Sequence, residues 1–332
     1  MKLFKLFPCF LALGPWLVAS AEIRIGMIGC DTSHSLAFTK DFNVKKTCAA
    51  IGDFRVTCAY QWGSRDIVSM TNRYPKYLPQ LADMGVRMVP SIAELLDQVD
   101  AVLLETNDGS EHESQALEVF KSGKPVFIDK PLSNTLVGSL KIVAAAKACG
   151  AKFFTTSSNR YQPNPRKARQ GEFGRIESAV LHAPYTSMEK HGRYTWYAIH
   201  GFEILETILG RGCKTVTVTA GEKDDVATCV WTDGRVGVAH FQTTCWEMGG
   251  YMLPKQGEEY VSIDIGRDEG YEALVAEIAR FFKTGIVPVD PGESLEIAAM
   301  MEAASVSRAK GGVPVSLADV LATAEKEIGT AK

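Results

Sequence analysis

Two residues of this chain have side chains suited to moving a proton, and both follow patterns that place them near a ligand. Lys130 comes directly after the buried run VFID and before Pro131, which fixes the turn. A lysine there is expected at the carboxyl end of a strand, facing a cleft. His200 lies in the helical pattern YAIHGFEILETILG, and imidazole titrates near neutral pH. These residue types suit acid–base catalysis; the alternatives are a solvated lysine and a core histidine.

The stretch Glu22–Ser35, EIRIGMIGCDTSHS, predicts a strand, a tight turn and the start of a helix. Dinucleotide-binding domains begin in this way, with the pyrophosphate on the helix N-terminus and a G-x-G-x-x-G turn. The six fingerprint positions here are Gly29, Cys30, Asp31, Thr32, Ser33 and His34. Asp31 adds bulk and negative charge beside the expected phosphates, or it caps the helix, as Thr32 also can. The turn therefore predicts either a dinucleotide site or a new polar cluster facing the cleft.

The acid that usually follows the second strand, for the ribose hydroxyls, is missing. Tyr60 and Gln61 stand there, with Ser64 and Arg65 just beyond. Serine and arginine suit a 2′-phosphate, so the sequence favours NADP over NAD if a dinucleotide binds.

Strand and helix patterns alternate through residues 22–158, which predicts a Rossmann-like, doubly wound and mostly parallel sheet. The expected strands after the first are 55–60, 86–90, 100–106, 124–129 and 151–157, and the expected helices are 91–98, 110–123 and 134–150. Ligands bind beyond the carboxyl ends of such strands. That rule brings together residues 29–34, 106–112, 129–131 and 157–161.

Residues 159–332 begin with strand patterns of period two and end with amphipathic helices. The expected strands are 171–185, 215–222, 226–232, 235–245 and 258–266, and the expected helices are 272–285 and 293–309. Asp233-Gly234 is a strong hairpin signal between two of the strands. We predict an α+β domain with an open, mostly antiparallel sheet and helices on one face.

Composition excludes several classes of protein. The 332 residues have a net charge of −3 and no basic run, which argues against binding nucleic acid or an anionic membrane. Apolar and charged residues make up 46% and 23%, as in ordinary globular proteins. The cysteines are scattered, without C-x-x-C or zinc-finger spacing, so no metal site and no particular disulfide are predicted.

Residues 1–21 predict a Sec-type signal peptide, and hence a periplasmic or secreted protein. Lys2 and Lys5 precede an apolar run, and Ala19-Ser20-Ala21 gives the small-x-small cleavage pattern. The alternative is a membrane anchor, but the run is short and contains two prolines. We expect no stable membrane insertion.

Several segments of the chain, taken in order, resemble the Gfo/Idh/MocA family, named for glucose–fructose oxidoreductase and inositol dehydrogenase. They are the first turn, DAVLLETNDGSEH (100–112), VFIDKPLS (126–133), SSNRY (157–161), YAIHGFEILETILG (197–210) and residues 293–317. Three departures stand out. Asn107 replaces a usual proline, Asp129 replaces the glutamate of an E-K-P motif, and the pattern D-x-G-x-H-x-x-D keeps His200 but has Trp196 and Glu203 for its acids.

The resemblance implies an NAD(P)-dependent oxidoreductase acting on a sugar or polyol. Lys130 would contact cofactor and substrate hydroxyl, and His200 would exchange the substrate proton. Thr106, His112 and Pro131 would lie on the cofactor side, and Asn159, Arg160, Tyr161, Tyr194, Trp196, Tyr197 and Glu203 on the substrate side. In the family the second sheet also supports oligomers, so a homo-oligomer is expected.

Two functions remain open at this point. One is an exported oxidoreductase, in which a cofactor that never exchanges could also permit elimination through transient oxidation. The other is a carbohydrate-binding protein that kept the fold and lost the cofactor, because fold does not fix function.

Overall fold

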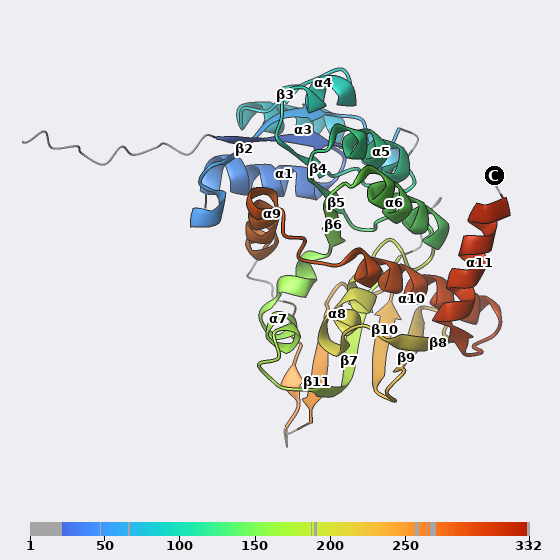
Figure 1. Ribbon diagram of the computed structural model, residues 1–332. Helices are drawn as coiled ribbons and strands as arrows, with labels where there is room; N and C mark the ends of the chain where they lie inside the picture. Colours follow the sequence, from blue (N-terminus) through green and yellow to red (C-terminus); the bar gives the residue numbers. More distant parts are fainter. Residues whose placement is uncertain are drawn as a thin grey trace, which may run out of the picture.

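The computed structural model describes residues 22–330, except 47, 66, 187, 189–190, 256–258, 264 and 266–269. The predicted signal peptide, residues 1–21, lies outside the described residues. The rest of the chain folds around two sheets, one above the other in Figure 1. No helix within the described residues has both the length and the apolar character to cross a membrane.

The first sheet has six parallel strands in the order β3-β2-β1-β4-β5-β6. The strands are β1 (Ile23–Ile28), β2 (Phe54–Tyr60), β3 (Arg87–Met88), β4 (Ala101–Leu104), β5 (Val126–Asp129) and β6 (Phe153–Thr156). This confirms the predicted doubly wound sheet. The strand order reverses between β1 and β4, and ligands of such sheets bind at that switch point.

Helices cover both faces of this sheet (Figure 1). They are α1 (Ser33–Lys40), with the helical turns η1 (Asp41–Lys45) and η2 (Ala49–Ile51) after it, α2 (Val68–Thr71), α3 (Tyr74–Asp83), α4 (Ile92–Leu96), α5 (His112–Ser122) and α6 (Leu136–Cys149). Phe38 of α1 packs in one core, and Phe120 of α5 packs in the other. Ser91 caps α4, since its Oγ accepts from the Glu94 amide at 3.1 Å.

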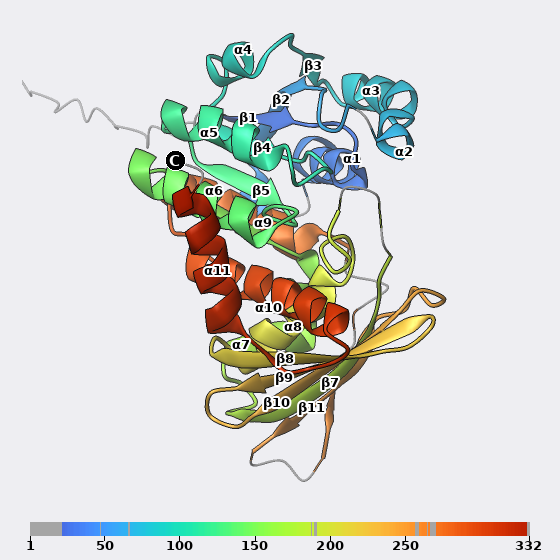
Figure 2. The same ribbon diagram turned by 90° about the vertical axis from the view of Figure 1, so that its right-hand side faces the viewer.

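The second sheet has seven strands in the order β12-β11-β7-β10-β9-β8-β13 (Figure 2). They are β7 (Ile176–Pro184), β8 (Cys213–Ala220), β9 (Asp224–Trp231), β10 (Val236–Gln242), β11 (Gly249–Pro254), β12 (Val261–Ser262) and β13 (Val315–Ser316). Only β7 and β10 pair in parallel, so the predicted antiparallel character is confirmed. The predicted hairpin joins β9 to β10, with Gly234 at φ 87°.

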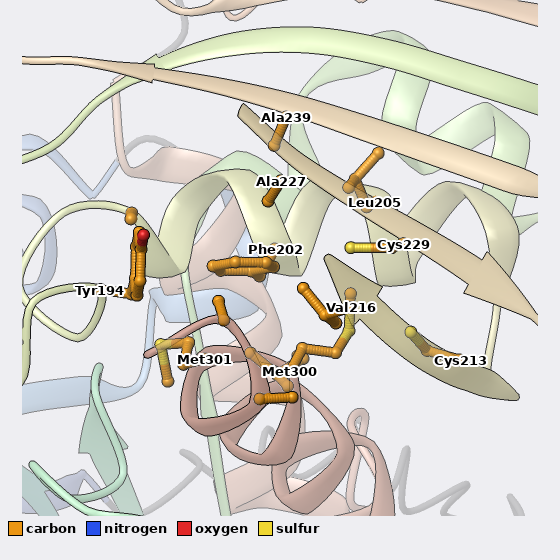
Figure 3. Close-up of a cluster of buried hydrophobic side chains, with 14 of the residues drawn as sticks. Tyr194, Phe202, Leu205, Cys213, Val216, Ala227, Cys229, Ala239, Met300 and Met301 are labelled. Carbon is orange, nitrogen blue, oxygen red and sulfur yellow. The ribbon is translucent and has the colours of Figure 1, made fainter. Parts of the chain in front are cut away.

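One face of the second sheet packs on two helices, α8 (Ile199–Leu209) and α10 (Pro291–Ala309). Figure 3 shows this core, with Phe202 and Leu205 of α8 and Met300 of α10 beside Cys229 of β9. Every residue of α8 is buried, because the sheet covers one side of it and α10 and the preceding segment cover the rest. His200 is therefore held on a rigid element.

Helix α9 (Glu272–Thr284) does not cover the second sheet, where the strand-then-helix order had placed it. It packs instead in the first core, with Phe281 at 5.1 Å from the ring of Phe154. Apolar periodicity identified this helix, but periodicity cannot say which sheet it will cover. The C-terminal half thus completes the core of the N-terminal half.

Other elements had no clear pattern in the sequence. Strand β11 contains two adjacent glycines, α3 contains Pro79, and α7 (Pro163–Arg169) begins at a proline. These residues are depleted in strands and helix interiors, so local propensity hid the elements. The C-terminal helix α11 (Leu317–Thr330) lies beside α6 in Figure 2 and was also missed.

The two halves are joined by a buried ion cluster around Arg160. This residue lies on the turn η3 (Ser158–Tyr161), and its guanidinium is 3.0 Å from each of Glu203, Glu206 and Glu293. Burial raises the pKa of Glu206 to about 7, although Arg160 opposes that rise. Arg160 therefore serves the fold, in contrast to its expected place on the substrate side.

We predict that Arg160→Met destabilises the protein by about 3–5 kcal/mol, because it leaves buried carboxylates without a counter-charge. Arg169→Met is the matched control: Arg169 reaches the same Glu293 but is 39% exposed, so its loss should cost about 1 kcal/mol or less. Urea unfolding followed by circular dichroism measures both. Equal losses for the two variants would contradict this role of Arg160.

Candidate active site

A cleft of about 240 Å³ opens at the carboxyl ends of the first sheet, between the two halves. Its lining residues are Thr32, Ser33, His34, Arg73, Asn107, Lys130, Ser158, Asn159, Trp196, Tyr197, His200, Met248 and Tyr271. None of these described lining residues is acidic, and Arg73 and Lys130 are cationic. A larger cavity of about 630 Å³ lies between α6, α10 and α11, but it contains none of the predicted site residues.

The structure brings Lys130 and His200 to this one cleft from opposite halves. Lys130 directly follows β5, and its Nζ lies 5.7 Å from the centre of the Tyr197 ring. His200 is the second residue of α8, and its Nδ1 lies 2.7 Å from Ser157 Oγ. The pattern D-x-G-x-H-x-x-D has an aspartate where this chain has Trp196, and here Ser157 is the residue that orients His200.

The environment of His200 favours its neutral form. Burial lowers the pKa of His200 well below the usual value, and the positive charges of Lys130 and His34 act in the same direction. A neutral imidazole near pH 7 is free to accept a proton. The residue therefore fits the role of a base better than that of a charged group.

Glu203 does not line the cleft but acts on His200 indirectly, through Ser157. The carboxylate accepts from the Ser157 amide at 2.8 Å and from Arg160 Nε at 3.0 Å, and the side chain is 3% exposed. It also accepts from Thr156 Oγ1. Glu203 thus fixes the segment that carries the hydrogen-bond partner of His200.

The other residues predicted on the substrate side divide into two groups. Asn159, Trp196 and Tyr197 line the cleft. Tyr194 is buried in the second core, where its hydroxyl donates to Asp225 at 2.8 Å, and Tyr161 packs against the first core. Aromatic residue type alone could not separate these two groups, because core packing and ligand contact use the same side chains.

The first fingerprint glycine keeps its usual role. Gly29 has φ 87°, and a Cβ there would lie 2.5 Å from the backbone nitrogen of Thr106. Thr32 caps α1, since its Oγ1 accepts from the His34 amide at 3.2 Å. Cys30 is buried in the first core, which raises the pKa of its thiol. The N-terminus of α1 therefore opens on the cleft through residues 32–34.

Asp31 does not present its charge to the cleft. The side chain is fully buried, and its two carboxylate oxygens accept from the amides of Ser64 at 3.0 Å and Asn107 at 3.2 Å. Burial raises the pKa of Asp31, whereas these hydrogen bonds lower it. The carboxylate therefore ties the loop after β2 to the loop after β4.

The remaining residues predicted on the cofactor side are mostly structural. Ser64 is fully buried, and Arg65 is exposed and donates to the Tyr60 hydroxyl at 2.9 Å. The His112 ring lies between the carbonyls of Thr106 and Leu132, at 2.7 and 3.2 Å. Thr106 Oγ1 donates to Gln115 at 2.6 Å, and Pro131 is buried after a cis peptide bond.

The residues at the cleft fit the diphosphate and nicotinamide portions of a dinucleotide. Gly29 permits the tight turn before α1, the N-terminus of α1 favours anions, and Arg73 adds a cation at the same end. The loop 61–65, which follows β2, is held by Asp31 through the Ser64 amide. The cleft of about 240 Å³ is smaller than the usual ligand pocket of about 300 Å³ or more, so it does not enclose a whole dinucleotide in this structure.

Several cleft residues had not been expected from the sequence. Arg73 Nη1 donates to the Asp31 carbonyl at 2.7 Å, and the Tyr271 ring lies 4.7 Å from the His34 ring. Trp246 is 62% exposed and packs 5.1 Å from Tyr197 at the edge of the cleft. Glu105, which is buried beneath the cleft, was also not expected, although its position directly after the buried run AVLL is a sequence signal.

Comparison with known proteins agrees with this geometry. Residues 23–157 match the model of the Gfo/Idh/MocA oxidoreductase family, described as an NAD-binding Rossmann fold. An inositol 2-dehydrogenase of Paenarthrobacter aurescens is 31% identical over 159 residues, which are 43% of this chain and 47% of that protein. One of Burkholderia vietnamiensis is 29% identical over 40% of this chain and 42% of its own length. The chain thus spans less than half the length of these relatives.

Solved structures resemble the chain over a greater length. The myo-inositol dehydrogenase of Lactobacillus casei, in complex with NAD(H) and myo-inositol, has a TM-score of 0.68 and 16% identity, and covers 89% of this chain and 96% of its own. The apo scyllo-inositol dehydrogenase of the same organism has a TM-score of 0.70 and 14% identity, covering 90% and 99%. At such low identity the likeness establishes the two-domain fold.

We predict that Asp31→Ala destabilises the protein by about 2–4 kcal/mol, because each buried amide left without an acceptor costs about 1–3 kcal/mol. Asp53→Ala, which removes a half-exposed partner of Lys283 at 3.5 Å, should cost about 1 kcal/mol or less. Thermal or urea unfolding measures both changes.

The effect of Asp31→Ala should also depend on pH. The pKa of Asp31 is higher in the folded state than in the unfolded state. The stabilisation from this carboxyl group therefore falls as the pH rises from the unfolded pKa through the folded one. The difference from the wild type is therefore larger at about pH 4 than at about pH 7. A difference that grows with pH would contradict the buried position of this carboxylate.

Proposed function

Because residues 23–157 match the Gfo/Idh/MocA oxidoreductase family, we propose that the chain is a member that uses NAD or NADP to oxidise or reduce a hydroxyl-bearing carbon of a sugar or polyol. The observation that carries the proposal is the meeting of Lys130 and His200 in one cleft, from two halves of the chain. A cationic donor and a neutral base facing the same space are what hydride chemistry at a secondary alcohol needs from the protein.

Each of the two residues has a separate task in this proposal. Lys130 donates a hydrogen bond to the reacting oxygen and stabilises the negative charge that develops there. His200 accepts the hydroxyl proton, and Ser157 holds the imidazole in position at 2.7 Å. The bound nicotinamide supplies the hydride acceptor. In the reductive direction, His200 returns the proton to the oxygen.

The lining of the cleft supports a hydroxyl-rich substrate. Asn159 and Ser158 offer polar contacts, and no acidic side chain occurs among the described lining residues. Trp196, Tyr197 and the exposed Trp246 give an aromatic border, which suits the C–H faces of a ring. Inositol dehydrogenases among the relatives and structural neighbours make cyclic polyols the first compounds to test.

A second function is favoured by the tie between Asp31 and the loop after β2. Loop 61–65 follows β2, where the adenosine ribose of a dinucleotide usually binds, and Asp31 holds this loop through the Ser64 amide at 3.0 Å. If that loop never lifts, the cleft is left to bind a sugar without a cofactor. Isothermal titration with NAD and NADP separates the two functions, and a cofactor that stays bound through purification would indicate one that does not exchange.

Lys130→Met and His200→Ala should each lower kcat/KM by at least about 100-fold, the lower end of the contribution of a positioned acid or base. The assay follows NAD(P)H absorbance with a panel of polyols, beginning with myo-inositol. Lys121→Met, an exposed lysine at the end of α5, is the control and should retain full activity. Undiminished turnover in either cleft variant would remove that residue from the mechanism.

We also propose that the protein is exported and forms a homo-oligomer through the open sheet. Residues 1–21 have the composition of a signal peptide, and β1 begins just after them at Ile23. Cleavage after Ala21 would leave the first strand complete.

Expression in a bacterial host with fractionation should therefore yield a periplasmic protein that begins at Glu22, as read by N-terminal sequencing. Replacement of Ala21 by a bulky residue should leave the precursor uncleaved, because signal peptidase requires a small residue there. A cytoplasmic protein that retains Met1 would contradict the proposed export.

A further inference from the structure

Three potential metal ligands meet beneath the floor of the cleft, on the side of the first sheet that α1 covers. They are His34 at the start of α1, Glu105 directly after β4 and Asp129 at the end of β5. One ligand atom from each lies within 4.8 Å of the other two. His34 stands at the third fingerprint position, where a glycine normally lets the helix approach the sheet.

The contacts of Glu105 mark this cluster as incomplete. Its side chain is fully buried, and neither carboxylate oxygen has a hydrogen-bond partner among the described residues. The neighbouring carboxylate is well supplied: Asp129 Oδ2 lies 2.8 Å from His34 Nδ1, and Oδ1 accepts from the Lys130 amide at 2.9 Å. Buried carboxylates are normally paired or coordinate a metal, so a fully buried Glu105 without a partner calls for a group that the protein chain does not supply.

The donor set indicates what that group is. One imidazole nitrogen and two carboxylate oxygens form a mixed N/O set, which suits a divalent first-row transition ion better than calcium or magnesium. Ligands on one ion lie about 3–4 Å apart when each bond is about 2.0–2.2 Å, so small side-chain rotations would bring these atoms into range. A divalent cation also balances the charge of the two acids.

We propose that His34, Glu105 and Asp129 bind a divalent transition-metal ion such as Mn²⁺ or Zn²⁺. Three protein ligands leave coordination positions for water or for an oxygen of a bound molecule, as in open metal sites. His34 lines the cleft, and Asp129 immediately precedes Lys130. The ion would therefore fix the positions of His34 and of the segment that carries Lys130. The proposal does not depend on the dehydrogenase activity.

The test is metal binding by the purified protein, after treatment with a chelator and without dinucleotide or sugar. Mn²⁺ is the first probe, because it avoids the thiols of free cysteines such as the exposed Cys149, and the spin-resonance signal of the free ion reports its binding. Zn²⁺ measured by elemental analysis is the second. We expect one ion per chain and a rise in thermal midpoint on addition of metal.

Glu105→Gln should weaken binding by more than about 100-fold, because even outer-shell changes cost about 10–100-fold. His240→Ala is the matched control: His240 lies 2.8 Å from Asp224 on the exposed second sheet, as a histidine–carboxylate pair without a third ligand in the described residues. This control should bind metal like the wild type.

Three results would overturn the proposal. They are no binding of either ion by the wild type, equal binding by Glu105→Gln and the wild type, or loss of binding in His240→Ala. If Glu105→Gln does not fold, as judged by circular dichroism, His34→Gln takes its place with the same expectation. Because neither probe measures turnover, failure of the proposed dehydrogenase function would leave the metal result unchanged.

Discussion

The position of the candidate base depends on one buried cation. The guanidinium of Arg160 is 3.0 Å from carboxylates of two helices, α8 and α10, and it lies on the turn that leaves the first sheet. One of these acids, Glu203, also holds the Ser157 amide, and Ser157 holds His200. One network of ion pairs and hydrogen bonds therefore both joins the two halves and orients the base. An enzyme that builds its site from two domains needs such a joint, because a small shift between them would separate His200 from Lys130.

The carboxyl edge of the first sheet contains more buried acid than a dinucleotide fold usually needs. Asp31, Glu105 and Asp129 are all 3% exposed or less. The three acids differ in what replaces their lost water. Asp31 accepts from two backbone amides, and Asp129 contacts His34 and the Lys130 amide. Glu105 has no hydrogen-bond partner among the described residues. The altered fingerprint residues Asp31 and His34 thus make polar contacts with the segments that follow β2, β4 and β5.

The sequence predicted the first sheet, the antiparallel second sheet and the place of Lys130 at a strand's carboxyl end, because strand periodicity and the carboxyl-end rule are local or topological signals. The place of His200 opposite Lys130 was implied by the family resemblance alone. The sequence could not predict that Asp31 turns away from the cleft, since that depends on the Ser64 and Asn107 amides, which come from distant parts of the chain. Nor could it tell the buried Tyr194 from the cleft residue Tyr197, because both lie in the same aromatic segment. Contacts across sheets have no short-range signature.

Helix α9 gives the molecule an unusual order of assembly. Its apolar face, which includes Ile278 and Phe281, completes a core that also contains Phe38 and Phe54, which precede it by more than half of the chain. The core on the face of the first sheet that α1 and α3 cover is therefore completed only when residues 272–284 have been synthesised. The proposed export would benefit from this delay, because one of the two cores of the nascent N-terminal half stays incomplete until residues 272–284 have left the ribosome.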